Sequence, residues 1–410
     1  MTSRERVLTA LDHREPDRVP VDLGGTVMSG IMACALDRYL RHLGITGRRV
    51  RVYEVFQMLG EVELDLVEKW RIDVLPVEPP ALFFELRRQR YKPWRLFDGT
   101  EVLVPGDFTV KIAPNGDWLL HTAGDPKRPV EGHMPKGGYY FDMVDLSRMD
   151  PAWEPPPLEK VRAEADRPTE ETLRFMSDRA AYLRRHTDKA LILIGLGWWG
   201  LPLVGTMLEQ LTLLASDPAY VGDLLALRTE IGRENLRRVW EAVGDKVDLV
   251  VLDGQDFGTQ RGEMFSPHLF VEVFAPQFAA QIRWIHEHTT WKVWQHTCGS
   301  IAQILPSLVA SKLDAINPVQ TSAHGMDPRT LKDAYGKRLT FWGGGVDTQK
   351  TLPFGTPEEV RREVRERIRI FGPGGGFVFA AVHNIQARTP PENIAAMLDA
   401  VREFGTYPIT

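Results

Sequence analysis

The sequence predicts an α/β protein built as a single (β/α)8 (TIM) barrel, and three observations support this fold. Eight short apolar runs are typical of buried strands, and stretches with helical spacing follow most of them. Polar and metal-ligating residue types follow nearly every run, as they do at the carboxyl ends of barrel strands. At 410 residues and 43% hydrophobic, the chain can bury a large core. A doubly wound open sheet, the alternative, usually has fewer strands and one ligand crevice.

The elements follow one another in a regular order. The predicted strands lie at residues 19–23, 73–77, 191–195, 249–252, 291–295, 315–318, 339–343 and 377–382. The predicted helices lie at 4–11, 31–43, 59–69, 169–184, near 207, and at 220–243, 267–288, 301–310, 357–371 and 391–404. Between the second and third strands, short alternating runs are split by Asp-Gly and Asn-Gly dipeptides, which favour tight hairpin turns. We therefore expect one domain, 1–410, with 80–143 as a β-rich insertion.

Composition excludes several classes of function. The formal charge is −5, from 50 basic and 55 acidic residues, and no long block of one sign occurs, which argues against nucleic-acid or polybasic membrane binding. Two cysteines in so long a chain suit a reducing cytoplasm. The start of the chain has no apolar signal region, and no apolar run approaches the roughly 20 residues of a membrane span. We expect a cytoplasmic protein.

The central candidates are metal ligands. His296 and Cys298 follow the fifth predicted strand, and His383 follows the eighth. In an extended His-x-Cys segment both side chains point to the same side, so they can bind one ion while His383 completes the site from another strand. This mixed nitrogen and sulfur set suits Zn²⁺ and leaves a position for substrate. Each residue taken singly could instead be an ordinary buried or hydrogen-bonded side chain.

Other polar residues end further strands. The candidate catalytic carboxylates, which could orient substrate or move a proton, are Asp253, Asp256 and Asp347. They could equally cap turns or helices, and Asp347 could be a fourth zinc ligand. The candidate substrate-binding residues are Gln260, Asn317, Gln320 and Gln349, with Trp198 and Trp199 as walls for an apolar or planar ligand. Ordinary packing is the alternative for the tryptophans.

Three segments resemble motifs of the uroporphyrinogen decarboxylase superfamily, namely 10–21, 296–301 and 344–349. True decarboxylases of that superfamily follow the opening motif with an arginine-containing segment, whereas residues 22–27 contain no arginine here. The methyltransferase branch, which includes the methylcobamide:coenzyme M methyltransferases, resembles the chain better. Those barrels hold zinc with His-x-Cys and a later cysteine, whose place His383 takes, so coenzyme M itself is not implied. The resemblance implies a corrinoid partner, usually cobalamin carried by a separate small protein.

We therefore predict a zinc-dependent, corrinoid-linked methyltransferase that moves a methyl group between a small-molecule heteroatom and cobalamin. A lyase resembling uroporphyrinogen decarboxylase is the first alternative, and it would need a basic cluster at the barrel mouth. A catalytically inactive barrel that binds a corrinoid protein is the second. The expected partners are a small-molecule methyl donor or acceptor, a corrinoid protein and, in a homodimer, a second copy of the chain.

Overall fold

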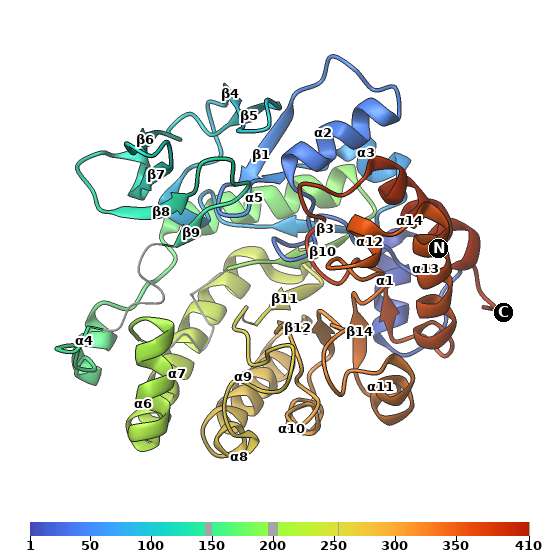
Figure 1. Ribbon diagram of the computed structural model, residues 1–410. Coiled ribbons are helices and arrows are strands. Elements are labelled where there is room, and N and C mark those ends of the chain that lie inside the picture. Colours follow the sequence, from blue (N-terminus) through green and yellow to red (C-terminus); the bar gives the residue numbers. More distant parts are fainter. Residues whose placement is uncertain (144–149, 196–203, 253, 410) are drawn as a thin grey trace.

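The computed structural model describes residues 1–143, 150–195, 204–252 and 254–409. Its centre is a curled parallel sheet of seven strands in the order β15-β14-β13-β12-β11-β10-β3 (Figure 1). These strands are β3 (Val74–Val77), β10 (Ala190–Leu193), β11 (Leu249–Val251), β12 (Lys292–His296), β13 (Ala315–Asn317), β14 (Thr340–Trp342) and β15 (Phe377–Val378). Each pairs in parallel with its neighbour, as in a barrel of βα units.

The segment expected as the first of eight strands pairs at a single residue, so the predicted count of eight is wrong for this sheet. Val21 forms an isolated parallel bridge with Phe379 just beyond β15, and its carbonyl accepts the backbone N–H of Asp73 at 2.8 Å. Pro20 has no N–H to donate, and the N–H of Val21 goes to the Asp73 carboxylate at 2.8 Å. The segment therefore bonds to both edges of the sheet without extending a ladder.

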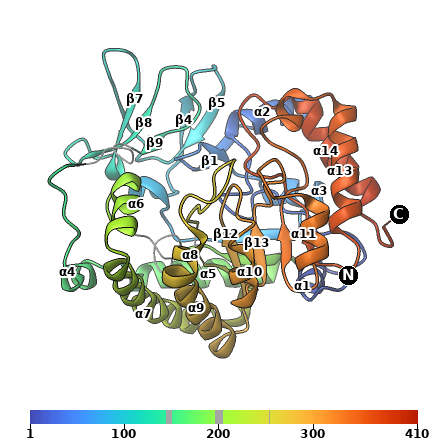
Figure 2. The ribbon, with the colours of Figure 1, turned by 60° about the horizontal axis from the view of Figure 1, so that its bottom comes forward.

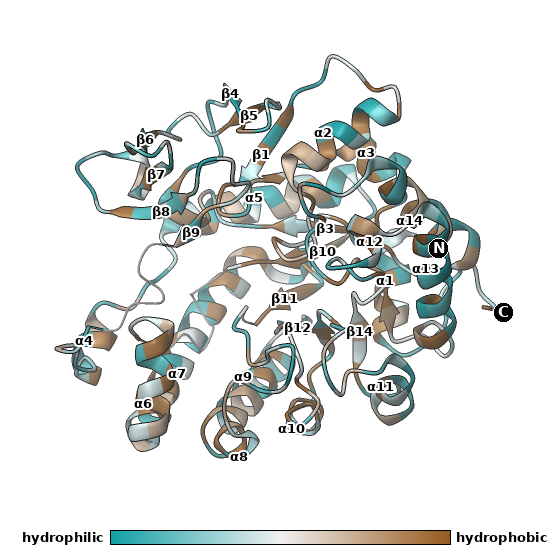
Figure 3. Cartoon of the chain, viewed as in Figure 1, coloured by the Kyte–Doolittle hydropathy of each residue, from teal (hydrophilic) through white to brown (hydrophobic). Residues whose placement is uncertain are grey.

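The central strands are apolar and buried, which is typical of a parallel sheet covered on both faces. All residues of β10, β11 and β13 are buried. Among the largest fully buried side chains are Trp291, Trp294 and Trp342. Figure 3 shows apolar residues gathered in the central strands and polar residues on the outer helices, such as α13 (Pro357–Phe371).

Helices cover the outside of this sheet (Figure 2). They are α1 (Ser3–Leu11), α2 (Ala33–His42), α3 (Leu64–Lys69), α4 (Leu158–Ala163), α5 (Glu170–His186), α6 (Met207–Ser216), α7 (Pro218–Val243), α8 (Pro267–Leu269), α9 (Ala275–His288), α10 (Leu305–Ala310), α11 (Pro328–Tyr335), α12 (Thr351–Phe354), α13 (Pro357–Phe371) and α14 (Pro391–Phe404). A π-helical segment, Phe270–Phe274, joins α8 to α9, so the helix predicted at 267–288 is continuous but not regular. Among the described residues, no helix is long and apolar enough to cross a membrane.

The region beside the sheet is richer in strands than the sequence predicted. β1 (Val50–Glu54) was not predicted, and β2 (Leu59–Gly60) occupies the start of the helix expected at 59–69. A Cβ at Gly60 would lie 2.7 Å from the Val50 side chain, so this strand contact needs glycine there.

Two small sheets form this region (Figure 1). The first has the order β2-β1-β5-β4, with β4 (Lys92–Arg95) and β5 (Glu101–Val104). The second has the order β6-β7-β8-β9, with β6 (Val110–Ile112), β7 (Trp118–His121), β8 (Val130–Met134) and β9 (Asp142–Met143). Because β4 and β5 share a sheet with β1 and β2, the β-rich part does not coincide with the predicted insertion at 80–143.

Candidate metal centre

The three predicted metal ligands lie together beyond the ends of β12 and β15. His296 is the last residue of β12, Cys298 lies two residues further, and His383 follows β15. One ligand atom from each residue lies within 4.8 Å of the other two. The two imidazole rings meet edge to face, with their centroids 5.7 Å apart. Two strand ends distant in sequence thus bring two nitrogens and one sulfur to one place.

A short hydrogen-bond chain fixes the orientation of His296. The amide nitrogen of Asn317 donates to the carbonyl oxygen of Trp342 at 3.0 Å, so the amide oxygen of Asn317 faces the ring. The Nδ1 of His296 lies 2.7 Å from that oxygen and therefore carries the ring proton. Its Nε2 is then the ring's acceptor and lies 3.3 Å from the Sγ of Cys298, whose thiol can donate to it when no metal is bound. A histidine held through its second nitrogen in this way is typical of metal sites.

Burial sets the protonation of all three side chains. It lowers the pKa of His296, and together with the neighbouring His296 it lowers the pKa of His383 to about 4, so both rings are neutral near pH 7. Burial also raises the pKa of the Cys298 thiol well above its usual range, with the Asp256 carboxylate adding to the effect. A bound cation would reverse that last shift, because it stabilises the thiolate. Two neutral imidazoles beside a thiol therefore fit a soft or borderline metal ion.

Asp256 lies at the edge of the cluster. Its Oδ1 accepts the backbone N–H of Cys298 at 2.7 Å and lies 3.6 Å from the Nε2 of His296. The side chain is 46% exposed. The carboxylate therefore holds the Cys298 backbone and can still reach a ligand in front of the cluster.

Two loops approach each other so closely beside the cluster that both need glycine. A Cβ at Gly258 would lie 2.6 Å from the carbonyl oxygen of Ser300 and 2.7 Å from that of Cys298. Gly299 has a φ of +86°, and a Cβ there would lie 2.4 Å from the Gly258 carbonyl carbon. The hydroxyl of Thr297 also accepts the Phe257 N–H at 2.8 Å. The loop after β11 thus buttresses the ligand loop after β12.

A cavity of about 270 Å³ opens beside the cluster, and Cys298 and His383 are part of its lining. The other residues that line it are Gly258, Thr259, Gln260, Gly299, Pro318, Gln320, Ser322, Asp347, Thr348, Gln349 and Val382. The predicted substrate-binding residues Gln260, Gln320 and Gln349 therefore line the cavity beside the candidate centre. Asn317 does not line this cavity and instead accepts a hydrogen bond from the His296 ring. No Lys or Arg occurs among the described residues of this lining.

Several of these polar groups already have partners within the chain. The Oε1 of Gln320 accepts the Gly299 N–H at 2.7 Å, and the Nε2 of Gln260 donates to the Oε1 of Gln349 at 3.0 Å. The Oδ1 of Asp347 accepts the N–H groups of Gln349 and of Lys350, at 2.6 and 2.9 Å. These two contacts cap the turn after Asp347, and capping a turn is the alternative role predicted for this residue. Asp347 is not among the residues whose ligand atoms lie within 4.8 Å of one another.

Three predicted site residues, Asp253, Trp198 and Trp199, lie outside the described residues.

The structure also reveals two buried polar residues that the sequence reasoning missed. Asp22 accepts the Trp342 Nε1–H and the Gly25 N–H, both at 2.8 Å, and burial raises its pKa to about 6. Asn384, next to His383, donates to the Val27 carbonyl at 2.8 Å and accepts the Gly30 N–H. Each is a polar residue at the end of an apolar run, and that signal could have identified both.

Parallel strands curled into a barrel-like sheet, with candidate ligands at their carboxyl ends, define the chain as an α/β barrel-type protein. The family model of uroporphyrinogen decarboxylase (URO-D) matches residues 137–404. The chain belongs to this family.

Curated relatives agree with that assignment, and a solved structure shares the fold. The uroporphyrinogen decarboxylase of Bordetella petrii is 27% identical over 252 residues, which are 58% of this chain and 66% of that protein. That of Herminiimonas arsenicoxydans is 33% identical over 113 residues, 25% of this chain and 31% of that protein. The chain thus spans less than two thirds of these relatives. A methyltransferase from Methanosarcina mazei shares the fold, with a TM-score of 0.56 and 15% identity over 98% of this chain and 99% of that one.

Proposed function

We propose that this protein is a zinc-dependent, corrinoid-linked methyltransferase, with the whole chain as one barrel domain. The cluster of His296, Cys298 and His383 is the observation that carries the proposal. Catalytic zinc sites have three protein ligands and one open position, and two of these ligands are partly exposed. The fold shared with the Methanosarcina mazei methyltransferase is compatible with this function.

The chain's own side chains would bind and orient the substrate. Zinc, when bound, supplies a Lewis acid that lowers the pKa of a substrate thiol or polarises an ether or alcohol oxygen. The exposed carboxylate of Asp256, 3.6 Å from the His296 ring, would accept a proton or a hydrogen bond from the substrate in this proposal. Gln260 and Gln349 offer amide groups on the cavity wall. Alignment of the two reactants is the main contribution that we assign to the protein.

The methyl group would pass to or from cobalamin on a separate corrinoid protein. This part of the proposal rests on the motif resemblance to the methyltransferase branch. The roles predicted for Asp253, Trp198 and Trp199 stay predictions from the sequence, since these residues lie outside the described residues.

A lyase that acts on a carboxylated substrate fits the cavity less well. Carboxylate recognition needs cationic or hydrogen-bond-donating groups, and the described lining of the cavity contains no Lys or Arg. At the position where decarboxylases of the superfamily carry an arginine segment, Asp22 is instead a buried acceptor.

Two measurements on one set of variants test the proposal. Protein purified without chelator is expected to hold close to one zinc per chain and to change the visible spectrum of cob(I)alamin or methylcobalamin with a matching methyl donor or acceptor. Cys298→Ala should lose both metal and activity. Cys34→Ala, in the buried part of α2, is the matched cysteine control and should keep both. Full zinc occupancy in Cys298→Ala, or full activity after complete zinc removal, would contradict the proposal.

A further inference from the structure

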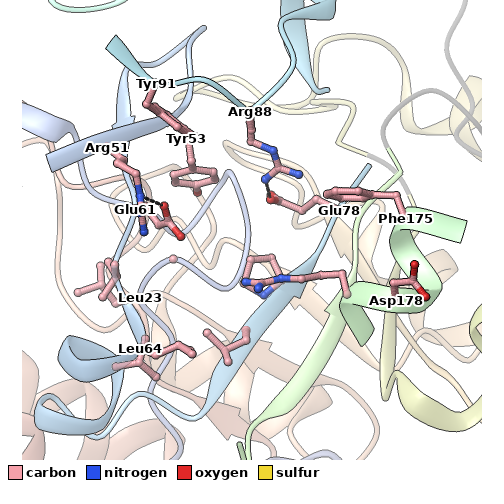
Figure 4. A pocket seen from close by; sticks show the side chains of 16 residues that line it. Leu23, Arg51, Tyr53, Glu61, Leu64, Glu78, Arg88, Tyr91, Phe175 and Asp178 are labelled. Atoms are coloured by element: carbon pink, nitrogen blue, oxygen red, sulfur yellow. Dashed lines mark hydrogen bonds and ion pairs between the residues drawn. The ribbon is translucent and has the colours of Figure 1, made fainter. Parts of the chain in front are cut away.

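A second and larger cavity lies outside the sheet, between β3 and the helices α3 and α5. Its volume is about 470 Å³, and β1 and the segment before β4 cover it. Figure 4 shows Tyr53 and Phe175 on either side of the ion pair between Arg88 and Glu78. This cavity shares no lining residue with the one beside the metal ligands.

Three polar atoms at this cavity are buried and have no hydrogen-bond partner among the described residues. They are the hydroxyl oxygen of Tyr53, the Oε1 of Glu78 and the Nε of Arg88. Tyr53 is 8% exposed and Glu78 is 3% exposed. Buried polar atoms in native proteins nearly always have a partner, so three around one cavity point to a ligand that supplies the bonds. The cavity volume is many times the ~30 Å³ share of one water molecule, so it has room for an organic ligand.

A cation without a carboxylate partner lines the same cavity. Arg51 pairs with Glu61 at 2.7 Å, and Arg88 pairs with Glu78. Arg179 on α5 has no carboxylate oxygen within 4.0 Å in the part of the chain that the structure describes; its guanidinium lies 5.9 Å from the centre of the Tyr182 ring. Burial lowers its pKa, although a guanidinium stays charged at neutral pH. A ligand anion would compensate that half-buried charge.

Apart from Tyr91 and the exposed carboxylate of Asp178, the rest of the wall is apolar. It is formed by Leu23, Val62, Leu64, Val67, Leu75, Pro76 and Phe175. Phe175 is 42% exposed, so an apolar ring remains open to solvent at the cavity. Together with the Tyr53 ring it offers aromatic faces on which a planar ligand can stack.

We propose that this cavity binds a small aromatic carboxylic acid that carries a hydroxyl or amino group. The carboxylate pairs with Arg179, and the hydroxyl or amino group donates to the Oε1 of Glu78 or bonds to the Tyr53 hydroxyl. The ring packs against Phe175 and the aliphatic wall. This site is separate from the metal centre and does not depend on the proposed methyl transfer.

Calorimetric titration of the full chain with three matched probes tests this site. The probe 4-hydroxyphenylacetate has both polar ends, phenylacetate lacks the hydroxyl, and tyramine replaces the carboxylate with an ammonium group. We expect the hydroxy acid to bind about tenfold or more tightly than either of the others. Equal binding of all three probes, or no heat from the hydroxy acid at millimolar concentration, overturns the proposal.

Three variants locate the binding. Arg179→Gln removes a cation that has no internal ion pair, so the fold should persist while 4-hydroxyphenylacetate binds about tenfold or more weakly. Arg174→Gln, the same change at an exposed position of the same helix, should bind like the unmodified protein. Cys298→Ala should also bind the probe normally, since it alters only the metal centre. Unchanged affinity in Arg179→Gln, or lost binding in either of the other two variants, would show that the probe does not bind here as proposed.

Discussion

The two cavities of this molecule contain different kinds of charged group although they belong to one chain and flank one sheet. The cavity beside His296, Cys298 and His383 has amides, hydroxyls and one aspartate on its described wall. The cavity beside β3 is lined by Arg51, Arg88 and Arg179, by the carboxylates of Glu61, Glu78 and Asp178, and by aromatic rings. The fold supplies the positions of both, and the side chains placed there determine the chemistry. Family membership alone therefore does not tell which reaction occurs at either place.

The absence of cations from the described wall of the first cavity has a direct physical consequence. A nearby guanidinium would repel a metal dication, and it would favour the carboxylated substrates of a decarboxylase. Neutral imidazoles and a thiol instead favour a cation. In the second cavity Arg51 and Arg88 pair with glutamates, whereas Arg179 has no ion pair within 4.0 Å among the described residues. Changes at each cavity should therefore affect metal binding and anion binding separately.

The largest expected effect comes from His383→Ala. The variant keeps the barrel folded, because the residue lies past the end of β15, but it loses one of three ligands. Metal affinity and methyl transfer should each fall by more than about 100-fold. This loss exceeds the roughly 10- to 100-fold weakening that usually follows removal of a residue that only hydrogen-bonds to a ligand. His288→Ala, which removes an exposed ring bonded to the Trp284 carbonyl, is the control. Metal analysis and circular dichroism check the result, and an unchanged zinc content would remove His383 from the site.

The next largest effect is a pH dependence of the unfolding free energy caused by Asp22, which lies between the two regions. Leu23 lines the second cavity, while Asp22 accepts a hydrogen bond from Trp342, whose carbonyl orients Asn317. Burial raises the pKa of Asp22 from 3.8 to about 6, so the native state binds the extra proton between these pH values. The contribution of Asp22 to the unfolding free energy should therefore fall by about 2 kcal/mol as pH rises from 4 to 6.

The variant Asp22→Asn removes this titration. Its stability should change less with pH over that range, although one lost acceptor lowers its overall stability by about 1–3 kcal/mol. Asp223→Asn, at an exposed position of α7, should keep the pH profile of the unmodified protein. Denaturant unfolding at several pH values measures the slopes. Identical slopes for Asp22→Asn and the unmodified protein would mean that Asp22 does not titrate in this range.

The sequence predicted those parts of the molecule that local pattern determines. The helices at 357–371 and 391–404 are confirmed with the same bounds, because amphipathic spacing and an opening proline mark each one. The three ligand residues were found because strand-end positions in a parallel sheet converge. The second cavity could not be predicted, since Arg51, Arg88 and Arg179 come from separate elements with no common spacing. The roles of Asn384 and Asp22 likewise depend on contacts between distant loops.

A smaller effect is expected from Asn317→Ala, which removes the hydrogen-bond acceptor of the His296 Nδ1–H but none of the candidate metal ligands. Loss of such a partner usually weakens metal affinity by about 10- to 100-fold. The matched control is Asn393→Ala, because Asn393 is also a buried amide and donates to the carbonyls of Leu352 and Gly355, at 2.9 and 2.8 Å. Both variants should lose stability, and only Asn317→Ala should lose metal affinity. Equal metal affinities in a chelator competition would show that Asn317 does not orient the ligand.

The smallest effect concerns the hydrogen bond between Gln260 and Gln349, which links the loops after β11 and β14 across the first cavity. Both side chains are exposed, so the bond should contribute less than about 1 kcal/mol to stability. A double-mutant cycle with Gln260→Ala and Gln349→Ala measures this coupling in the unfolding free energy.

The same variants distinguish a structural link from a substrate contact. If the two amides only hold the loops together, either substitution should have the same effect on KM as the double variant, because either one breaks the bond. If each amide binds substrate, the two single variants should raise KM independently and the double variant should combine both increases. We expect independent increases, since both side chains line the cavity beside Cys298 and an exposed bond of this kind is easily exchanged for one to substrate. Full coupling in KM would assign the pair to loop structure and leave the other polar side chains of the cavity wall, such as Thr259 and Ser322, to bind substrate.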